Sequence, residues 1–189
     1  MQGQQSSTRD IVYIALFAGL TAALSLFPPI TIPAIGVPIS AQSLGPMLAG
    51  SILGARRGGL ALLLFVGLVA VGLPLLSGGR GGLGVFFGPS GGYIIGWVVA
   101  AYVIGLLHEW GWRRLNVVSS FIYCVIGAII VLYAIGITWT SFVVDLSLLK
   151  TAMASSLFVI GDVIKAGVAA AIAVSVKRSY PIIQKTAVA

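Results

Sequence analysis

The sequence predicts an all-α polytopic membrane protein, in which six transmembrane helices form a single membrane-embedded domain over residues 1–189. Apolar residues make up 59% of the chain and charged residues only 8%. A soluble domain carries about 25% charged residues, and with far fewer it could not cover its surface with polar groups. The apolar residues also gather in runs that approach the roughly 20 residues needed to cross a membrane as a helix. The bilayer is therefore the expected solvent.

The six predicted spans follow these runs, at residues 11–27, 39–53, 58–76, 93–107, 120–137 and 152–176. The first is expected to be a retained span and not a signal peptide, because no small-residue cleavage site leads from it into a polar domain. The second and fourth are short, and each meets a segment rich in Pro or Gly, PPITIPAIGVP or GGRGGLGVFFGPSGG. Such segments predict non-helical backbone inside the fold. The third, fifth and sixth runs are close to the length needed for a full crossing.

The basic residues predict the orientation of the bundle. An even number of spans places both termini on one side, and most bases fall there: Arg9, Arg56, Arg57, Arg113, Arg114, Lys177, Arg178 and Lys185. The opposite loops hold only Arg80 and Lys150. By the positive-inside rule, both termini are expected to be cytoplasmic. The net charge of +7 comes from bases scattered between apolar runs, so no nucleic-acid-binding face is expected.

Asp162 and Lys165 are the only charged residues in the apolar run FVIGDVIKAGVAAAIA of the sixth span. Each would cost about 2.5 to 3.5 kcal/mol at the centre of a membrane helix, and their i,i+3 spacing puts them on one helical face. Measured from Val176 at about 1.5 Å per residue, Asp162 lies roughly 21 Å from the inner end, in the outer half of the membrane. Two interpretations are open: a structural ion pair, or the floor of a cavity that opens outward.

The Gly-rich segment SGGRGGLGVFFGPSGGY, residues 77–93, is predicted to lie on the outer side. Glycines such as Gly82 permit positive φ angles and close backbone approach, while Phe86 and Tyr93 bring aromatic faces. A phosphate-binding loop is a poor match, because its Lys-Ser/Thr ending and preceding strand are missing. A plain flexible loop is a further alternative. An apolar lid over the outer cavity accounts better for the aromatic residues, with Arg80 available to an anionic group.

Gln42 lies in the stretch VPISAQSLGPMLAG, at the outer end of the second predicted span. Because an amide both donates and accepts hydrogen bonds, Gln42 could orient the polar head of a ligand. It could equally cap or bridge helices, and the sequence leaves both roles open.

Small residues line the first predicted span at a spacing that lets another helix approach closely. They are Ala15, Gly19 and Ala23 on one face, with Ala18 and Ala22 beside them. The partner is either another helix of the same chain or another subunit, so this surface is a candidate docking face.

Little in the sequence points to catalysis, to a cofactor or to a metal. Cys124 is the only cysteine, which excludes a disulfide framework and a thiolate metal site. His108 and Glu109 begin the motif HEWGW, which lacks the second histidine of a zinc-protease helix and is typical of an interfacial anchor. Without a Ser-His-acid set or paired membrane carboxylates, the charges predict a binding protein and not an enzyme.

The passages LPLLSGGRGGLGVFFGPSGGY and GDVIKA, supported by VPISAQ, resemble the BioY family, the biotin-binding S components of energy-coupling factor (ECF) vitamin transporters. The resemblance covers nearly the whole chain, although Ser90 and Ile160 stand where the family often has Thr and Pro. It implies a six-helix S-component fold, biotin capture on the outer face, and coupling to a transmembrane T subunit and two cytoplasmic ATPases. The expected ligand-binding residues are then Asp162, Lys165, Gln42, Arg80, Gly82, Phe86 and Tyr93.

Biotin suits these residues chemically. Its ureido head presents N–H donors and a carbonyl acceptor, which Asp162 and Lys165 can complement, and its bicycle is apolar. Its carboxylate could meet Arg80, Gln42 or backbone N–H groups, or form a salt bridge with Lys165. The alternatives are an S component for another vitamin, a solitary secondary biotin carrier, a proton-coupled carrier that uses Asp162 as a relay, and an intramembrane enzyme.

Overall fold

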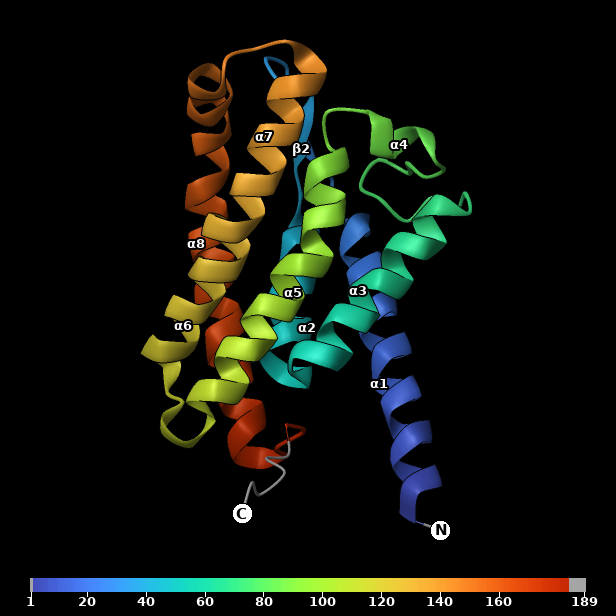
Figure 1. Cartoon of the computed structure of the whole chain (residues 1–189), viewed down its shortest axis with the longest axis vertical. Coiled ribbons are helices and arrows are strands. Elements are labelled where there is room, and N and C mark those ends of the chain that lie inside the picture. Colours follow the sequence, from blue (N-terminus) through green and yellow to red (C-terminus); the bar gives the residue numbers. More distant parts are fainter. Residues whose placement is uncertain (1, 184–189) are drawn as a thin grey trace.

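The computed structural model describes the backbone of residues 2–183 and the side chains of residues 8–30 and 33–183. This part of the chain is mostly helical (Figure 1), with helices α1 (Gln2–Ala23), α2 (Leu44–Leu53), α3 (Ala55–Ala70), α4 (Gly84–Phe87), α5 (Gly91–Gly111), α6 (Val117–Val125), α7 (Leu132–Val144) and α8 (Leu148–Ser179). The short strands β1 (Ile30–Ile32) and β2 (Val37–Ile39) form an antiparallel hairpin. The predicted helical class is confirmed, and the hairpin is an unpredicted addition to it.

Four helical segments of the described chain are long and apolar enough to cross a membrane, namely Thr8–Leu26, Gly91–Arg114, Val117–Val144 and Leu148–Ser179. The third of these joins α6 to α7 through a π-helical stretch, Ile126–Val131. They overlap the first, fourth, fifth and sixth predicted spans. The fourth prediction was too short, because α5 continues through most of the HEWGW motif to Gly111.

The second and third predicted spans correspond to shorter helices. α2 has 10 residues and α3 has 16, or about 15 and 24 Å at 1.5 Å per residue, against a hydrocarbon core of about 30 Å. The prediction of helix from residue 39 is wrong, because β2 ends there and a 3₁₀ turn follows at Ala41–Ser43 before α2 begins. α3 ends at Ala70 and not at residue 76, since the chain turns at Gly72 with φ +104°, a conformation that favours glycine.

The Pro-rich segment before α2 is non-helical, as predicted. Its two strands pair with Ile30 opposite Ile39 and with Ile32 opposite Val37, and the connecting turn contains Gly36 at φ +65°. The hairpin lies near the end of the bundle that is remote from the start of α1 and the end of α8 (Figure 1). It thereby brings irregular backbone beside the upper turns of α5 and α7.

α5 occupies the centre of the bundle and packs against α2, α3 and α7. Gly105 of α5 lies directly against the α2–α3 turn, where the backbone of Gly54 and Ala55 fills the space that a Cβ would need. Glu109, one turn further on, accepts a hydrogen bond from the Ala55 N–H at 2.8 Å. The α2–α3 turn is therefore fixed to α5 by close backbone packing and by a side-chain cap at the start of α3.

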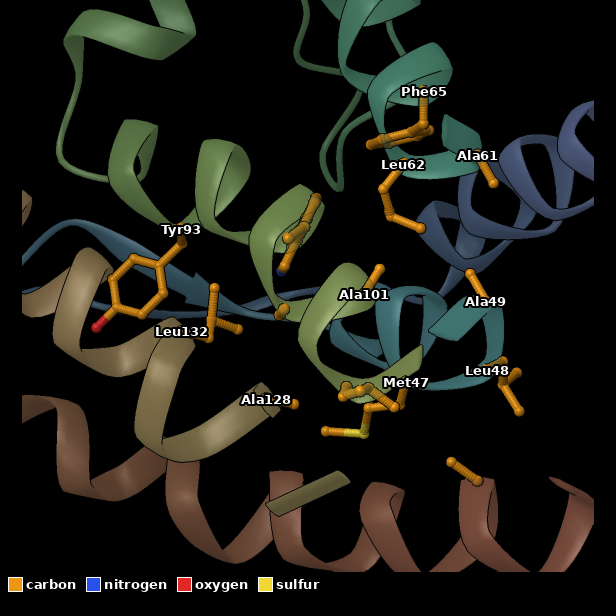
Figure 2. Close-up of a cluster of buried hydrophobic side chains, with 14 of the residues drawn as sticks. Met47, Leu48, Ala49, Ala61, Leu62, Phe65, Tyr93, Ala101, Ala128 and Leu132 are labelled. Atoms are coloured by element: carbon orange, nitrogen blue, oxygen red, sulfur yellow. The ribbon is translucent and has the colours of Figure 1, made fainter. Parts of the chain in front are cut away.

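The buried core joins these helices through small and branched side chains. Figure 2 shows Met47 of α2, Leu62 and Phe65 of α3, Ala101 of α5 and Ala128 of the π-helical stretch gathered in one cluster. Further core residues come from α1, α6, α7 and α8. The short helices α2 and α3 thus bury their apolar surface against the long ones.

Most of the basic residues belong to segments at the end of the bundle where α1 begins and α8 ends, and Figure 1 shows the position of these segments. There Arg57 pairs with Asp10 of α1 at 2.9 Å, and Lys177 of α8 donates to the Leu115 carbonyl at 3.2 Å. The α3–α4 loop and the first turn of α8, which carry the two predicted outer bases, lie at the opposite end. Lys185 lies outside the described residues. The charge asymmetry agrees with the predicted orientation, and the cytoplasmic assignment itself stays a prediction.

Candidate ligand-binding site

A cavity of about 60 Å³ lies between β2, α5, α7, α8 and the loop that follows α3. A space of this size has room for a few water molecules. Of the predicted ligand-binding residues, the cavity is lined by Asp162, Lys165, Gln42, Arg80 and Tyr93. Residues that are far apart in the sequence therefore converge on one small space.

Asp162 forms the centre of the polar floor, and its side chain is only 6% exposed. Its Oδ1 accepts hydrogen bonds from Lys165 Nζ at 2.9 Å and from Ser43 Oγ at 2.8 Å, and its Oδ2 accepts one from Tyr133 OH at 2.7 Å. Hydrogen bonds to a charged group contribute about 1.5–3 kcal/mol each. Together they offset the cost of holding a carboxylate inside an apolar bundle.

Lys165 is equally well satisfied. Besides Asp162, its Nζ donates to Ser43 Oγ at 2.8 Å and to the Ser40 carbonyl at 2.7 Å. An ammonium group has three donors, so protein groups occupy all of them. The acid and base form a neutral pair that links α8 to the turn before α2 and also faces the cavity. The geometry agrees in part with both interpretations, because the pair links two segments of the fold and also lines the cavity. Contact between the pair and a ligand stays a prediction.

Aromatic rings form one wall of the cavity. The ring of Tyr93 meets those of Tyr133 and Phe158 edge to face, with centroids 6.1 Å apart in both pairs. The Tyr93 hydroxyl donates to Ser155 Oγ at 3.2 Å. This ring also packs on Gly136 of α7, where a side chain would collide with it. The wall is thus a rigid apolar surface beside the polar floor.

Tyr133, Phe158 and Ser43 belong to the site but were not predicted from the sequence. Ser43 directly follows Gln42, so the stretch VPISAQS offered a signal for it. Tyr133 lies 29 positions from the carboxylate that it contacts, and nothing in its local sequence marks it. It follows the π-helical stretch Ile126–Val131, which adds a residue to the helical turn and so changes the direction of the side chains that follow.

Arg80 lines the cavity from the loop after α3. Its Nε donates to the Ser77 carbonyl at 3.2 Å, and its Nη1 donates to Ser90 Oγ at 3.3 Å. Partial burial lowers the pKa of the Arg80 guanidinium from its usual value. No acidic side chain pairs with it among the described residues. Arg80 therefore supplies a positive charge that the protein leaves uncompensated at the cavity wall.

Gln42 is 1% exposed, and its amide is fully used by the protein. Its Nε2 donates to the carbonyls of Thr21 at 3.1 Å and Leu75 at 2.9 Å. Its Oε1 accepts from both the N–H and the hydroxyl of Ser77, at 2.8 and 2.9 Å. Of the two roles left open by the sequence, these contacts favour the bridge, which joins α1 to the loop after α3. A ligand contact by Gln42 stays a prediction.

The Gly-rich segment does not form the predicted aromatic lid over this cavity. Gly82, at φ +85°, turns the chain and donates its N–H to the Val69 carbonyl at 2.8 Å. Phe86 lies in the single helical turn α4 and packs partly against the core, while Phe87 is 75% exposed. Neither Gly82 nor Phe86 lines the cavity in this structure, and their contact with a ligand stays a prediction. The segment contributes other residues to the cavity lining, namely Ser77, Arg80, Ser90 and Tyr93. Arg80 reaches the cavity from a loop that folds back on Leu76.

The small residues of α1 divide into two groups. Ala15, Gly19 and Ala23 are exposed, and Gly19 has no neighbouring atom within 4 Å of a Cβ position. Ala18 is 3% exposed and belongs to the core, and Ala22 packs partly against it. The prediction that Ala18 forms part of a docking face is therefore wrong, because α1 uses this side to pack on its own bundle.

Membrane-length helices around a small cavity with a buried acid–base pair define a membrane-embedded ligand-binding protein. The chain belongs to the BioY family, whose model matches residues 1–182.

The relatives cover almost the entire chain. It is 49% identical over 185 residues to the biotin transporter BioY of Rhizobium etli, which spans 94% of this chain and 97% of that protein. It is 41% identical over 170 residues to the probable biotin transporter BioY of Bacillus subtilis, covering 90% and 91% of the two chains. The crystal structure of the S component for biotin from an ECF-type ABC transporter superimposes with a TM-score of 0.87 at 31% identity, over 92% of this chain and 93% of that one.

Replacement of Gln42 by Ala should destabilise the protein. The change removes the acceptor of the buried Ser77 N–H and the donor to the carbonyls of Thr21 and Leu75, and a buried polar group left without a partner costs about 1–3 kcal/mol. We expect a clear fall in the apparent melting temperature of the detergent-solubilised protein. Thr138→Ala is the control, because that exposed hydroxyl donates only to the carbonyl of its own helix. A variant Q42A that melts like the wild type would contradict the bridging role.

Proposed function

We propose that this chain is the substrate-binding S component of an ECF transporter and that it takes up biotin. The proposal is supported by the relatives named as biotin transporters and by the fold shared with a biotin S component. The single observation within the molecule that carries it is the neutral pair of Asp162 and Lys165 beneath an aromatic wall. The pair could exchange some of its present protein partners for the donors and acceptor of a polar ring, and the aromatic wall provides apolar surface for the rest of the ligand.

We further propose the direction in which biotin lies. The carboxylate of Asp162 already neutralises Lys165 at 2.9 Å, so this end of the cavity suits the uncharged ureido ring. Arg80 stands at the cavity wall with only uncharged partners, so it suits the carboxylate of the valeryl chain. A salt bridge from biotin to Lys165 would instead have to compete with Asp162 for the same ammonium group.

Binding of biotin requires the cavity to widen. Its volume of about 60 Å³ holds only a few water molecules, and its boundary includes the loop that carries Ser77 and Arg80. Loops open locally at lower free energy than packed helices do. We therefore propose that the segment between α3 and α5 moves outward to admit the ligand, although its two Phe residues do not cover the cavity in the ligand-free conformation.

We propose that residues 1–189 form one domain that crosses a prokaryotic plasma membrane six times, with both termini in the cytoplasm. The basic residues at the end where α1 begins support this orientation. α2 and α3 would complete their crossings with the non-helical segments at their outer ends, which is possible where irregular backbone is buried in protein. In this orientation the cavity faces the outside.

We propose that transport is coupled to ATP hydrolysis by partner proteins. The sequence contains no phosphate-binding loop of the ATPase type, so the energy would come from two cytoplasmic ATPases through a transmembrane T subunit. The exposed row of Ala15, Gly19 and Ala23 on α1 is the docking face that we propose for this subunit, because small residues let two membrane helices approach closely.

Loss of either charge in the cavity should weaken biotin binding. Asp162→Ala or Lys165→Ala removes a charged hydrogen-bonding group, worth about 1.5–3 kcal/mol or roughly 10- to 150-fold in Kd. Radiolabelled biotin and purified protein provide the measurement. Asp162→Asn retains the side-chain volume and tests whether charge alone matters, and exposed Lys150→Ala is the control. Wild-type affinity in both alanine variants would assign the pair to a structural role only.

The orientation of biotin can be tested with biotin methyl ester, which lacks the negative charge. If Arg80 holds the carboxylate, the wild type should prefer biotin over the ester by roughly tenfold, or about 1.4 kcal/mol, as for a partly buried charged hydrogen bond. In Arg80→Gln that preference should disappear. A preference that survives in Arg80→Gln and is lost in Lys165→Ala would support the opposite orientation.

Coupling through α1 predicts separate effects on binding and on uptake. Gly19→Leu adds a side chain where the chain itself has no neighbour, so biotin binding by the purified protein should be unchanged. In cells that also produce the T subunit and the ATPases, biotin uptake by this variant should fall to the level that the wild type shows without these partners. Gly167→Leu on α8 is the matched control, because this glycine also has free space around it. Uptake that is independent of the partner subunits would reject the coupled mechanism.

A further inference from the structure

An apolar groove runs along the outer surface of the bundle between α3 and α5, on residues that the ligand cavity does not use. Its volume is about 450 Å³. Leu60, Leu63 and Val99 form its walls, and each is 40% or more exposed. The groove faces the surroundings of the bundle, so within a membrane its contents would be drawn from the lipid phase.

Gly59 of α3 lines the groove without a side chain. A Cβ at this position would lie 3.5 Å from Cδ2 of Tyr102 on α5, which is ordinary van der Waals distance. The two helices therefore approach each other here, and bare backbone forms the floor of the groove. The channel extends along α3 from Arg56 to Leu63, roughly 10 Å at 1.5 Å per residue.

Arg56 closes one end of the groove and differs from its neighbour Arg57. Arg57 is neutralised by Asp10 at 2.9 Å and also donates to the Ile182 carbonyl at 3.3 Å. Arg56 is exposed, and no acidic side chain pairs with it among the described residues. It lies in the first turn of α3, and the Glu109 carboxylate caps the N-terminus of this helix at the Ala55 N–H without an ion pair to Arg56. The groove thus joins an apolar channel to an uncompensated positive charge at the basic end of the bundle.

We propose that this groove binds a phospholipid with a net negative headgroup, with one acyl chain against Gly59 and Leu63 and the phosphate paired with Arg56. The order of the features matches such a lipid: the charge lies at the level of the basic membrane interface, and the apolar channel runs from there toward the bilayer centre. A soluble anion would match Arg56 but not the apolar walls. A zwitterionic headgroup carries a cation beside its phosphate, and this cation would partly cancel the attraction between the phosphate and Arg56.

The neighbouring arginines supply a matched comparison. Arg113 and Arg114 follow the end of α5, are also exposed, and also have no acidic partner among the described side chains. Neither lines the α3–α5 groove. General attraction between a basic surface and anionic lipid would involve all these arginines to a similar extent, whereas a built site depends on Arg56.

The test uses native mass spectrometry of the full chain in detergent with added phosphatidylglycerol or phosphatidylcholine. One arginine near a lipid surface contributes about 1 kcal/mol, so Arg56→Gln should weaken phosphatidylglycerol binding roughly fivefold. Arg114→Gln should change it less than twofold, and phosphatidylcholine should bind more weakly than phosphatidylglycerol to the wild type. Equal losses in the two variants, or no lipid preference in the wild type, would overturn the proposal.

Position within the groove has a separate readout. Phosphatidylglycerol that carries a photoreactive group in its acyl chain should crosslink mainly to residues 59–63 and 98–102. Crosslinks spread over the exposed apolar face of α8 would overturn the proposed site, even if the lipid bound. Because Arg56 does not line the ligand cavity, biotin affinity in Arg56→Gln should match the wild type.

Discussion

The fold around the cavity depends on how one acidic and one basic side chain are held among apolar helices. Asp162 and Lys165 lie 2.9 Å apart on α8, and their other partners come from Ser40, Ser43 and Tyr133. These partners belong to the turn before α2 and to α7, so the three segments must meet at one point. Displacement of any of them would leave a buried charge without a partner, at a cost of about 3–5 kcal/mol.

The second constraint is the irregular backbone beside the short helices. α2 and α3 are short, and non-helical segments precede α2 and follow α3. Such backbone is tolerated only when its polar groups are bonded within the protein. Gln42 meets this need, because its amide binds the carbonyls of Thr21 and Leu75 and both donors of Ser77. The same residue that holds the short helices in place therefore also fixes the loop that carries Arg80.

The distribution of acids explains where charge is available to ligands. The chain has only 4 acidic residues: Asp10 pairs with Arg57, Asp162 pairs with Lys165, Glu109 caps α3, and Asp145 is exposed in the α7–α8 turn. Arg80 in the cavity and Arg56 beside the groove consequently lack an acidic partner among the described side chains. Both stand next to apolar surface, an arrangement that suits an amphiphilic anion.

Local composition by itself determined the helical class, the long helices at the first, fifth and sixth predicted spans, the non-helical Pro-rich segment and the placement of Asp162 and Lys165 on one face. These features depend on hydropathy and helical period, which are read within a single segment. The ends of α2 and α3, the bridging role of Gln42 and the participation of Tyr133 were decided by tertiary structure. So were the absence of Gly82 and Phe86 from the cavity and the burial of Ala18. In each case the deciding contact joins segments that are distant in the sequence, and hydropathy carries no information about such pairs.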